Sequence, residues 1–138
     1  MSALTEAYEA ERQDGEIVDV PVKASAVIYK GGLVVDKGTG YAEAGDDGSG
    51  YTFLGVAVES ATGGSADGSV SLRVYKTGSY KYTLAGGASQ TNLGNLVYVS
   101  DDQTVGTSST NSVYCGYIVK VEDSTYVRVR IDFNGFEV

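Results

Sequence analysis

A strand-turn-strand unit that occurs twice is the feature of this sequence that most constrains its fold. Residues 55–59 (Gly-Val-Ala-Val-Glu) lead through a turn to residues 70–74 (Val-Ser-Leu-Arg-Val), and residues 116–120 (Gly-Tyr-Ile-Val-Lys) lead to residues 127–131 (Val-Arg-Val-Arg-Ile). Apolar side chains recur at every other position of both second strands, which is typical of a strand with one buried and one solvated face. A true duplication and two merely similar hairpins explain this short match equally well, and both predict a β scaffold.

The composition supports the same fold class. Glycine makes up 19 of the 138 residues, which is about twice the usual ~7%. Valine, threonine and tyrosine dominate the stretches between the glycine-rich turns, so strands are expected to be short and numerous. We predict an all-β chain: a small β-sandwich or β-barrel of about nine to eleven short strands with a flexible N-terminal arm.

The first 15 residues differ from the rest of the chain. They contain good helix formers and few β-branched residues. Leu4, Ala7, Tyr8 and Glu11 would share one helical face, but a lone segment of this length is marginal as a helix in water. We interpret residues 1–15 as a flexible arm and residues 16–138 as a single β domain, a length that suits one core. A frayed terminus without a role is an equally good reading of the arm.

Two local signals refine the β prediction. Pro21 lacks a donor N–H group, so its strand is expected at a sheet edge or at a bulge. The small polar stretch 86–95 is expected to hold one helical turn. The single Cys115 lies in an apolar strand, which predicts a buried and unreactive thiol and rules out an intramolecular disulfide.

Charge and hydropathy argue against two classes of partner. The formal net charge is −8, and the ten Lys and Arg residues are scattered along the chain. Such a surface repels phosphate backbones, so no nucleic-acid partner is expected. Neither a run of about 18 apolar residues nor a charged and then apolar leader is visible, so we expect a soluble, unsecreted chain without a membrane partner.

The residue types needed for most catalysis are missing. The chain has no His, which removes the commonest general base and the commonest transition-metal ligand. The acidic pairs Asp46–Asp47 and Asp101–Asp102 occupy turn contexts that favour Asp for local reasons. The segment 63–68 departs from the spacing of calcium repeats, and the glycine clusters are typical of hairpins. We therefore predict no enzymatic activity, no catalytic residues, no metal site and no cofactor.

The eleven tyrosines allow two interpretations. Tyr75, Tyr80, Tyr82 and Tyr126 would suit a binding face, because tyrosine is enriched at protein interfaces. The same residues would equally serve cross-strand packing inside the fold.

The order of segments resembles one known family. The arm is followed by the segments 15–22, 26–34, 53–58, 93–102 and 116–119, and this arrangement over residues 14–132 is similar to the small capsid cement, or head decoration, proteins of tailed bacteriophages. The resemblance implies a β-rich homotrimer that docks between capsomers on the outer surface of the expanded icosahedral head. It also implies a structural protein whose partner is the major capsid protein, without enzymatic activity or cofactor.

Under this resemblance the arm is the expected contact with the shell, through Leu4, Tyr8 and Arg12. It would become ordered on docking, as a helix in a groove or as a strand added to a capsid sheet. The alternative function is a trimeric phage fibre or tail module that binds a host surface, since it would share the acidic, β-rich composition.

Overall fold

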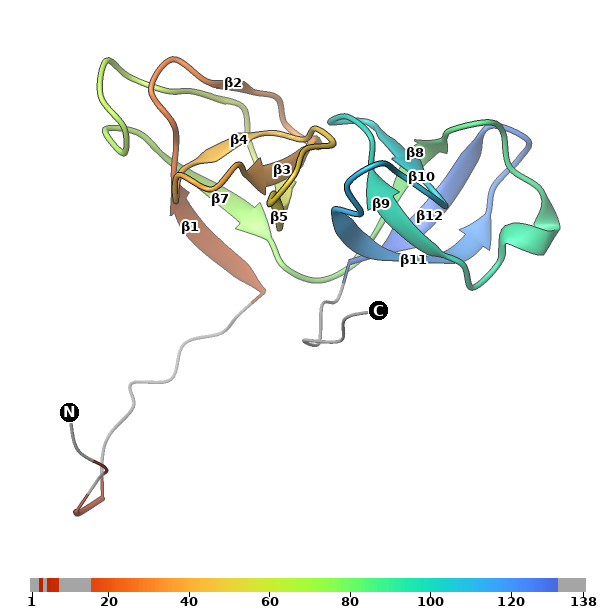
Figure 1. Ribbon diagram of the computed structural model, residues 1–138, viewed down its shortest axis with the longest axis horizontal. Coiled ribbons are helices and arrows are strands. Elements are labelled where there is room, and N and C mark those ends of the chain that lie inside the picture. The colour runs from red at the N-terminus through yellow and green to blue at the C-terminus, as the bar shows by residue number, and fades with distance from the viewer. Residues whose placement is uncertain (1–2, 4, 8–15, 132–138) are drawn as a thin grey trace.

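The computed structural model describes residues 3, 5–7 and 16–131. Within this part the chain runs through twelve strands and one short 3-10 helix, and it forms two halves that lie side by side (Figure 1). The first half contains β1 (Ile17–Pro21), β2 (Val27–Ile28), β3 (Leu33–Asp36), β4 (Ala42–Ala44), β5 (Thr52–Ala57), β6 (Ala61–Thr62) and β7 (Ser71–Tyr75). The second half contains β8 (Ser79–Leu84), the 3-10 helix η1 (Gln90–Asn92), β9 (Leu96–Val99), β10 (Thr104–Gly106), β11 (Tyr114–Val121) and β12 (Tyr126–Arg130).

Both halves have the same strand arrangement. The first is a five-stranded sheet in the order β1-β7-β5-β3-β4, and a parallel bridge between Val22 and Ala42 links its two edges. The second is a closed barrel in the order β10-β8-β12-β11-β9, where β10 and β8 make the parallel closure. The small β2-β6 pair lies outside the five-stranded sheet of the first half.

Backbone hydrogen bonds show that the two halves are structural repeats. The Lys76 amide donates to the Glu16 carbonyl at 2.8 Å, and the Ile131 amide donates to the Gly78 carbonyl at 3.0 Å. Two further backbone bonds recur in the same way. The bond from the Val22 amide to the Val70 carbonyl matches that from Leu84 to Thr125, and the bond from the Gly31 amide to the Ala57 carbonyl matches that from Gly94 to Ile118. Residues 16–76 and 78–131 therefore repeat one β fold.

The repeat corrects one detail of the sequence alignment. The first strands of the unit match as expected, since Val56 pairs with Tyr75 and Tyr117 pairs with Arg130. The second strands match two residues further along, so that Lys76 and not Val74 corresponds to Ile131. A shift of two preserves the alternation of buried and exposed side chains, which is why the sequence pattern could not reveal it.

A glycine stands at the same bulge in each repeat. Gly55 has φ +146° and Gly116 has φ +155°, and each follows an irregularity in the pairing with the neighbouring strand. A Cβ atom at Gly55 would lie 2.3 Å from the Tyr75 carbonyl oxygen, and one at Gly116 would lie 2.2 Å from that of Arg130. Only glycine allows this close approach of two backbones.

The protein has two hydrophobic cores in its described residues, and residues of both repeats contribute to the larger one. The smaller core fills the first repeat and includes Val34, Ala57 and Val74. The larger core fills the second repeat and continues into the layer between the repeats, where Leu33, Val35 and Val56 of the first repeat join it. Successive residues of β3 thus face different cores, which fixes the position of one repeat against the other.

The predicted all-β fold class is confirmed, with twelve strands in the described residues. This count exceeds the predicted nine to eleven, and the short strands β6 and β10, of two and three residues, lie in turn-like sequence that carries no strand pattern. Pro21 is in an edge strand and η1 lies within 86–95, both as predicted. Among the described residues, none belongs to a helix of the length and apolarity needed to span a bilayer.

Candidate functional site

The arm residues predicted to bind a partner, Leu4, Tyr8 and Arg12, lie outside the described residues. The strand that follows the arm is described and is unusual for this protein. β1 is an edge strand, and its Ile17 and Val18 side chains are 43% and 37% exposed. An apolar edge strand that presents unpaired backbone groups is a natural place for another chain to bind.

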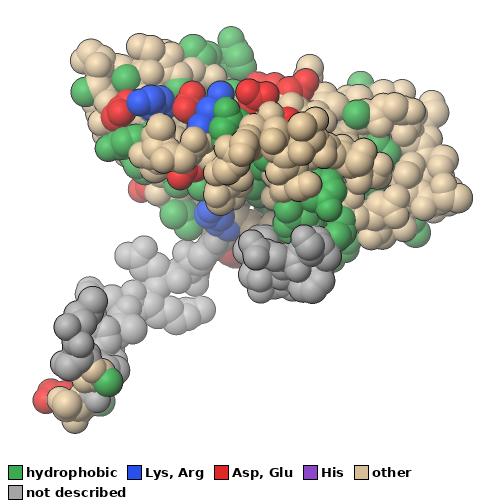
Figure 2. All heavy atoms as spheres, viewed as in Figure 1, with side chains coloured by type: hydrophobic (Ala, Val, Ile, Leu, Met, Phe, Trp, Pro, Cys, Tyr) green, Lys and Arg blue, Asp and Glu red, His purple; other side chains and the backbone are tan. Residues whose placement is uncertain are grey.

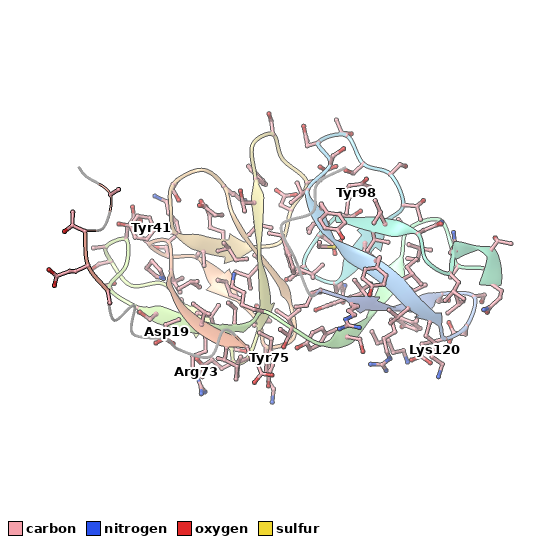
Figure 3. The ribbon with its side chains drawn as sticks, turned by 90° about the horizontal axis from the view of Figure 1, so that it is seen from below. Asp19, Tyr41, Arg73, Tyr75, Tyr98 and Lys120 are labelled. Atoms are coloured by element: carbon pink, nitrogen blue, oxygen red, sulfur yellow. The ribbon has the colours of Figure 1, made fainter. Side chains whose placement is uncertain are left out.

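A charged cluster lies on the strand that pairs with β1. The Arg73 guanidinium contacts both carboxylate oxygens of Glu59, at 2.7 and 3.3 Å, and Asp19 of β1 is the register partner of Arg73 (Figure 3). The hydrogen bonds from Arg73 hold the pKa of Glu59 below its usual value. Both side chains are largely exposed, so the pair shapes the charge of this surface more than it stabilises the fold.

Charged side chains are distributed unevenly over the face seen in Figure 2. Red and blue atoms gather over the first repeat and are sparse over the second. In the first repeat, the Lys37 ammonium lies 3.9 Å from the Glu43 carboxylate and 3.7 Å from that of Asp46. On this face the two repeats therefore differ in charge although they share a backbone fold.

Most of the tyrosines proposed for a binding face pack inside the protein instead. Tyr82 is 5% exposed and donates its hydroxyl to the Gly31 carbonyl oxygen at 2.7 Å. Tyr75 and Tyr80 pack against the larger core with ring centroids 5.8 Å apart. The packing interpretation is thus confirmed for these three residues.

Tyr126 is 38% exposed and lines a surface groove of about 580 Å³. The Lys81 ammonium lies 4.6 Å from the centroid of its ring, a cation–π contact. Tyr29, which is 64% exposed, stands on the opposite repeat and also lines this groove. The two aromatic rings and Lys81 make a second candidate contact surface.

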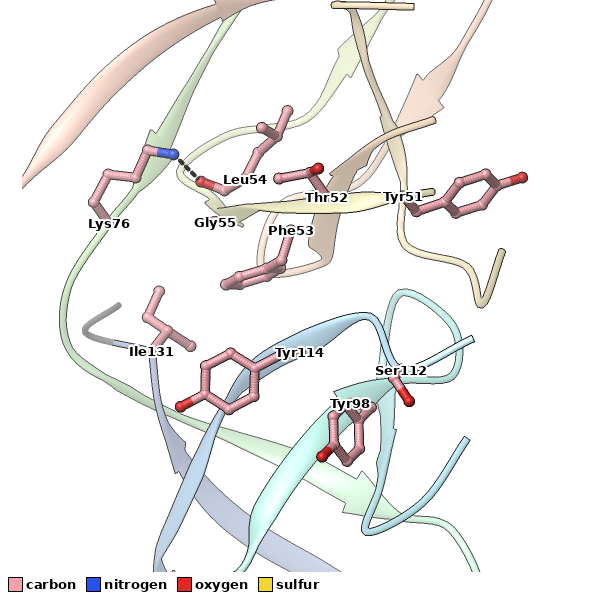
Figure 4. A pocket seen from close by; sticks show the side chains of 10 residues that line it. All are labelled: Tyr51, Thr52, Phe53, Leu54, Gly55, Lys76, Tyr98, Ser112, Tyr114 and Ile131. Carbon is pink, nitrogen blue, oxygen red and sulfur yellow. Dashed lines mark hydrogen bonds between the residues drawn. The ribbon is translucent and has the colours of Figure 1, made fainter. Parts of the chain in front are cut away.

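A cleft of about 500 Å³ lies between the repeats (Figure 4). Its walls include Phe53 and Leu54 from β5, Tyr98 from β9 and Tyr114 from β11. The Lys76 ammonium points toward the same space and donates a hydrogen bond to the Leu54 carbonyl oxygen. The cleft is lined by apolar and polar groups in similar proportion, with one cation at its wall.

Asp101 serves a turn, as expected, whereas the Asp47 carboxylate binds a distant loop, and the two acidic pairs also meet. Asp46 and Asp101 form an isolated antiparallel bridge that joins the repeats, a long-range contact that no local pattern could predict. The Asp47 carboxylate accepts hydrogen bonds from the amides of Thr110 and Asn111, both at 3.2 Å. Asp101 accepts a hydrogen bond from the Gln103 amide at 2.9 Å. Among the residues that the structure describes, no group of His, Cys, Asp or Glu is arranged to hold a metal ion.

The glycine-rich loop 63–68 and the cysteine also have structural explanations. Asp67 accepts a hydrogen bond from the Ala24 amide at 2.9 Å and one from the Lys23 ammonium at 3.0 Å, and both lower the pKa of its carboxyl group. Cys115 is 2% exposed, and burial raises the pKa of its thiol. The buried thiol predicted from the sequence is confirmed.

Comparisons with known proteins complete the description. A family model described as phage cement protein matches residues 12–132. A search of curated proteins found no match. A solved structure, the head fibre gp8.5 N base of bacteriophage phi29, is similar with 14% sequence identity and a TM-score of 0.45, over 83% of this chain and 93% of that one.

Proposed function

Because the chain belongs to the phage cement protein family, and is thus a capsid-associated structural protein of the virion surface, we propose that it binds the outer face of the expanded icosahedral head and stabilises it. The family match over residues 12–132 is the observation that carries this proposal. The partner is the major capsid protein, and the protein acts by binding alone, without catalysis.

The physical basis of stabilisation is mass action. A protein that binds the assembled shell but not its separated subunits lowers the free energy of the assembled state. A homotrimer, which we include in the proposal, would bind three neighbouring sites at once and gain avidity from their effective concentration. Sedimentation equilibrium tests the trimer directly, with an expected mass three times the 14.4 kDa of the chain.

The first repeat is the side of the molecule that we propose to face the shell. The arm enters the protein at β1, and the exposed Ile17 and Val18 continue the apolar character of Leu4 and Tyr8 at this edge. The Glu59–Arg73 ion pair lies beside β1, since Arg73 is on the neighbouring strand β7, and it would add charge specificity at the border of an apolar contact.

Co-sedimentation with purified heads tests the function. We expect saturable binding to expanded heads and much weaker binding to unexpanded heads, because the shell surface rearranges on expansion. Equal binding to both forms would remove the preference for the expanded state. Binding to host cells without binding to heads would instead support a fibre or tail module.

A pair of arm variants tests where binding occurs. Leu4→Asp combined with Tyr8→Asp places charges on the proposed apolar face and should weaken head binding at least tenfold, about 1.4 kcal/mol or more. Thr5→Asp combined with Gln13→Asp adds the same charge away from that face and serves as the control. Equal affinities of the two variants for the head would contradict a contact through Leu4 and Tyr8.

A further inference from the structure

The cleft between the repeats has an aromatic wall and a cation, Lys76, that has no anionic partner among the described residues. Phe53, Leu54, Tyr98 and Tyr114 are all partly exposed around a volume that falls within the ~300–1,000 Å³ usual for ligand sites. Tyr98 and Tyr114 stand edge to face, with ring centroids 6.2 Å apart. Among the described residues no carboxylate pairs with Lys76, whose ammonium contacts the Leu54 carbonyl oxygen.

The internal repeat shows that Lys76 is unusual at its position. The equivalent residue of the second repeat is Ile131, which is 1% exposed and belongs to the larger core. The first repeat thus has a lysine where the second has a buried aliphatic side chain. Partial burial lowers the pKa of Lys76, so the charged side chain is held there at some cost. Packing alone does not account for a lysine at this position, whereas a carboxylate brought into the cleft would.

The sequence directly after Ile131 supplies the matching chemistry. Residues 132–138 read Asp-Phe-Asn-Gly-Phe-Glu-Val, which includes two of the three phenylalanines of the chain and two carboxylates. Ile131 itself lines the cleft, so this segment is tethered at the site. Three extended residues span roughly 10 Å, and Ile131 lines the cleft, so the segment is long enough to reach into it.

We propose that the cleft between the repeats binds residues 132–138 of the same chain, with Phe133 and Phe136 against the aromatic wall and a carboxylate of the segment beside Lys76. The tether gives the segment a high effective concentration, so weak individual contacts are sufficient to hold it. Binding would cover the apolar wall and provide Lys76 with a counter-ion. The proposal is independent of head binding and stands or falls separately from it.

Photo-crosslinking in the full chain tests the proposal. A benzoylphenylalanine placed at Phe136 should crosslink to peptides that contain Phe53, Tyr98 or Tyr114, as mapped by mass spectrometry. The same probe at Val27, an exposed position of β2 outside the cleft lining, is the control and should not label these peptides. Crosslinks from position 136 to other parts of the surface would overturn the proposal.

Mixing unlabelled and isotope-labelled chains shows whether the cleft is filled by its own chain or by a second copy. Crosslinks within one chain support the proposal, and their yield should be unchanged on about tenfold dilution because the reaction is intramolecular. Crosslinks between labelled and unlabelled chains would show that a second copy fills the cleft and would contradict it.

NMR spectroscopy provides a second, independent test of the proposal. Phe133→Ala combined with Phe136→Ala should move the ring resonances of Tyr98 and Tyr114 and leave those of the buried Tyr82 unchanged. Asp132→Asn combined with Glu137→Gln should lower the pKa of the Lys76 ammonium, because a nearby carboxylate favours its charged form. Unchanged Tyr98, Tyr114 and Lys76 signals in these variants would exclude the segment from the cleft.

Discussion

At the scale of single residues, the two bulge glycines are the most demanding positions of the fold. We predict that Gly55→Ala or Gly116→Ala lowers the free energy of unfolding by at least about 2 kcal/mol, because a Cβ atom would overlap a carbonyl oxygen in addition to the backbone strain. Gly94→Ala is the matched control: Gly94 has φ +86° and no atom within 4 Å of the place that a Cβ atom would take, so only about 1 kcal/mol should be lost. Equal losses in urea unfolding would contradict the close approach at the bulges.

The Glu59–Arg73 pair makes the second residue-scale prediction. Its hydrogen bonds lower the pKa of Glu59 in the folded state, so the stabilisation is present near neutral pH and is lost as the pH falls through the lowered pKa. Arg73→Met should raise the pKa of Glu59 toward 4.5, and the stability difference from the parent protein should shrink in acid. Carboxyl NMR titration measures the pKa. Arg128→Met, which breaks the contact with Glu122, should leave Glu59 unchanged.

At the scale of elements, Asp47 joins loops from the two repeats. Its carboxylate accepts the amides of Thr110 and Asn111, which are more than sixty positions away in the chain. We predict that Asp47→Ala costs about 1–2 kcal/mol and speeds hydrogen exchange at both amides. Asp102→Ala, whose carboxylate has no such role in the hydrogen bonds of the described residues, should leave these amides protected. Unchanged exchange in Asp47→Ala would show that the loop is held by other contacts.

The elements also show what the sequence could predict. β7 and β12 lie where the repeated unit predicts strands, because their alternation of buried and exposed side chains can be recognised locally. β6 and β10 could not be predicted, since two or three residues become a strand only through pairing with distant partners. The candidate surfaces could not be predicted from the sequence for the same reason. The cleft is formed by β5, β9 and β11, and no local sequence pattern shows that these strands lie together.

At the scale of the whole molecule, the shared core predicts cooperative unfolding, and we propose that residues 16–138 form one domain despite the repeat. Val34 and Val35 are neighbours on β3, yet they face the smaller and the larger core respectively. Val34→Ala and Val35→Ala should each cost about 1–3 kcal/mol and shift one common transition. Two separate transitions, followed by tyrosine fluorescence and by circular dichroism, would mean that the repeats fold independently.

The two repeats also differ in charge on the face shown in Figure 2. The first repeat presents the arm, the edge strand β1 and most of the charge seen in Figure 2, while the second repeat is closed into a barrel. A closed barrel offers no long free edge for unwanted pairing, which supports our proposal that a partner contacts the first repeat.

The thermal stability of expanded heads at increasing concentrations of this protein tests the central claim most directly. If the protein stabilises the shell by binding its assembled form, the midpoint of head disruption should rise with the logarithm of the free protein concentration above the dissociation constant. The arm variant Leu4→Asp with Tyr8→Asp should need a higher concentration for the same rise. A midpoint that stays constant while the heads are fully decorated would contradict the stabilising function.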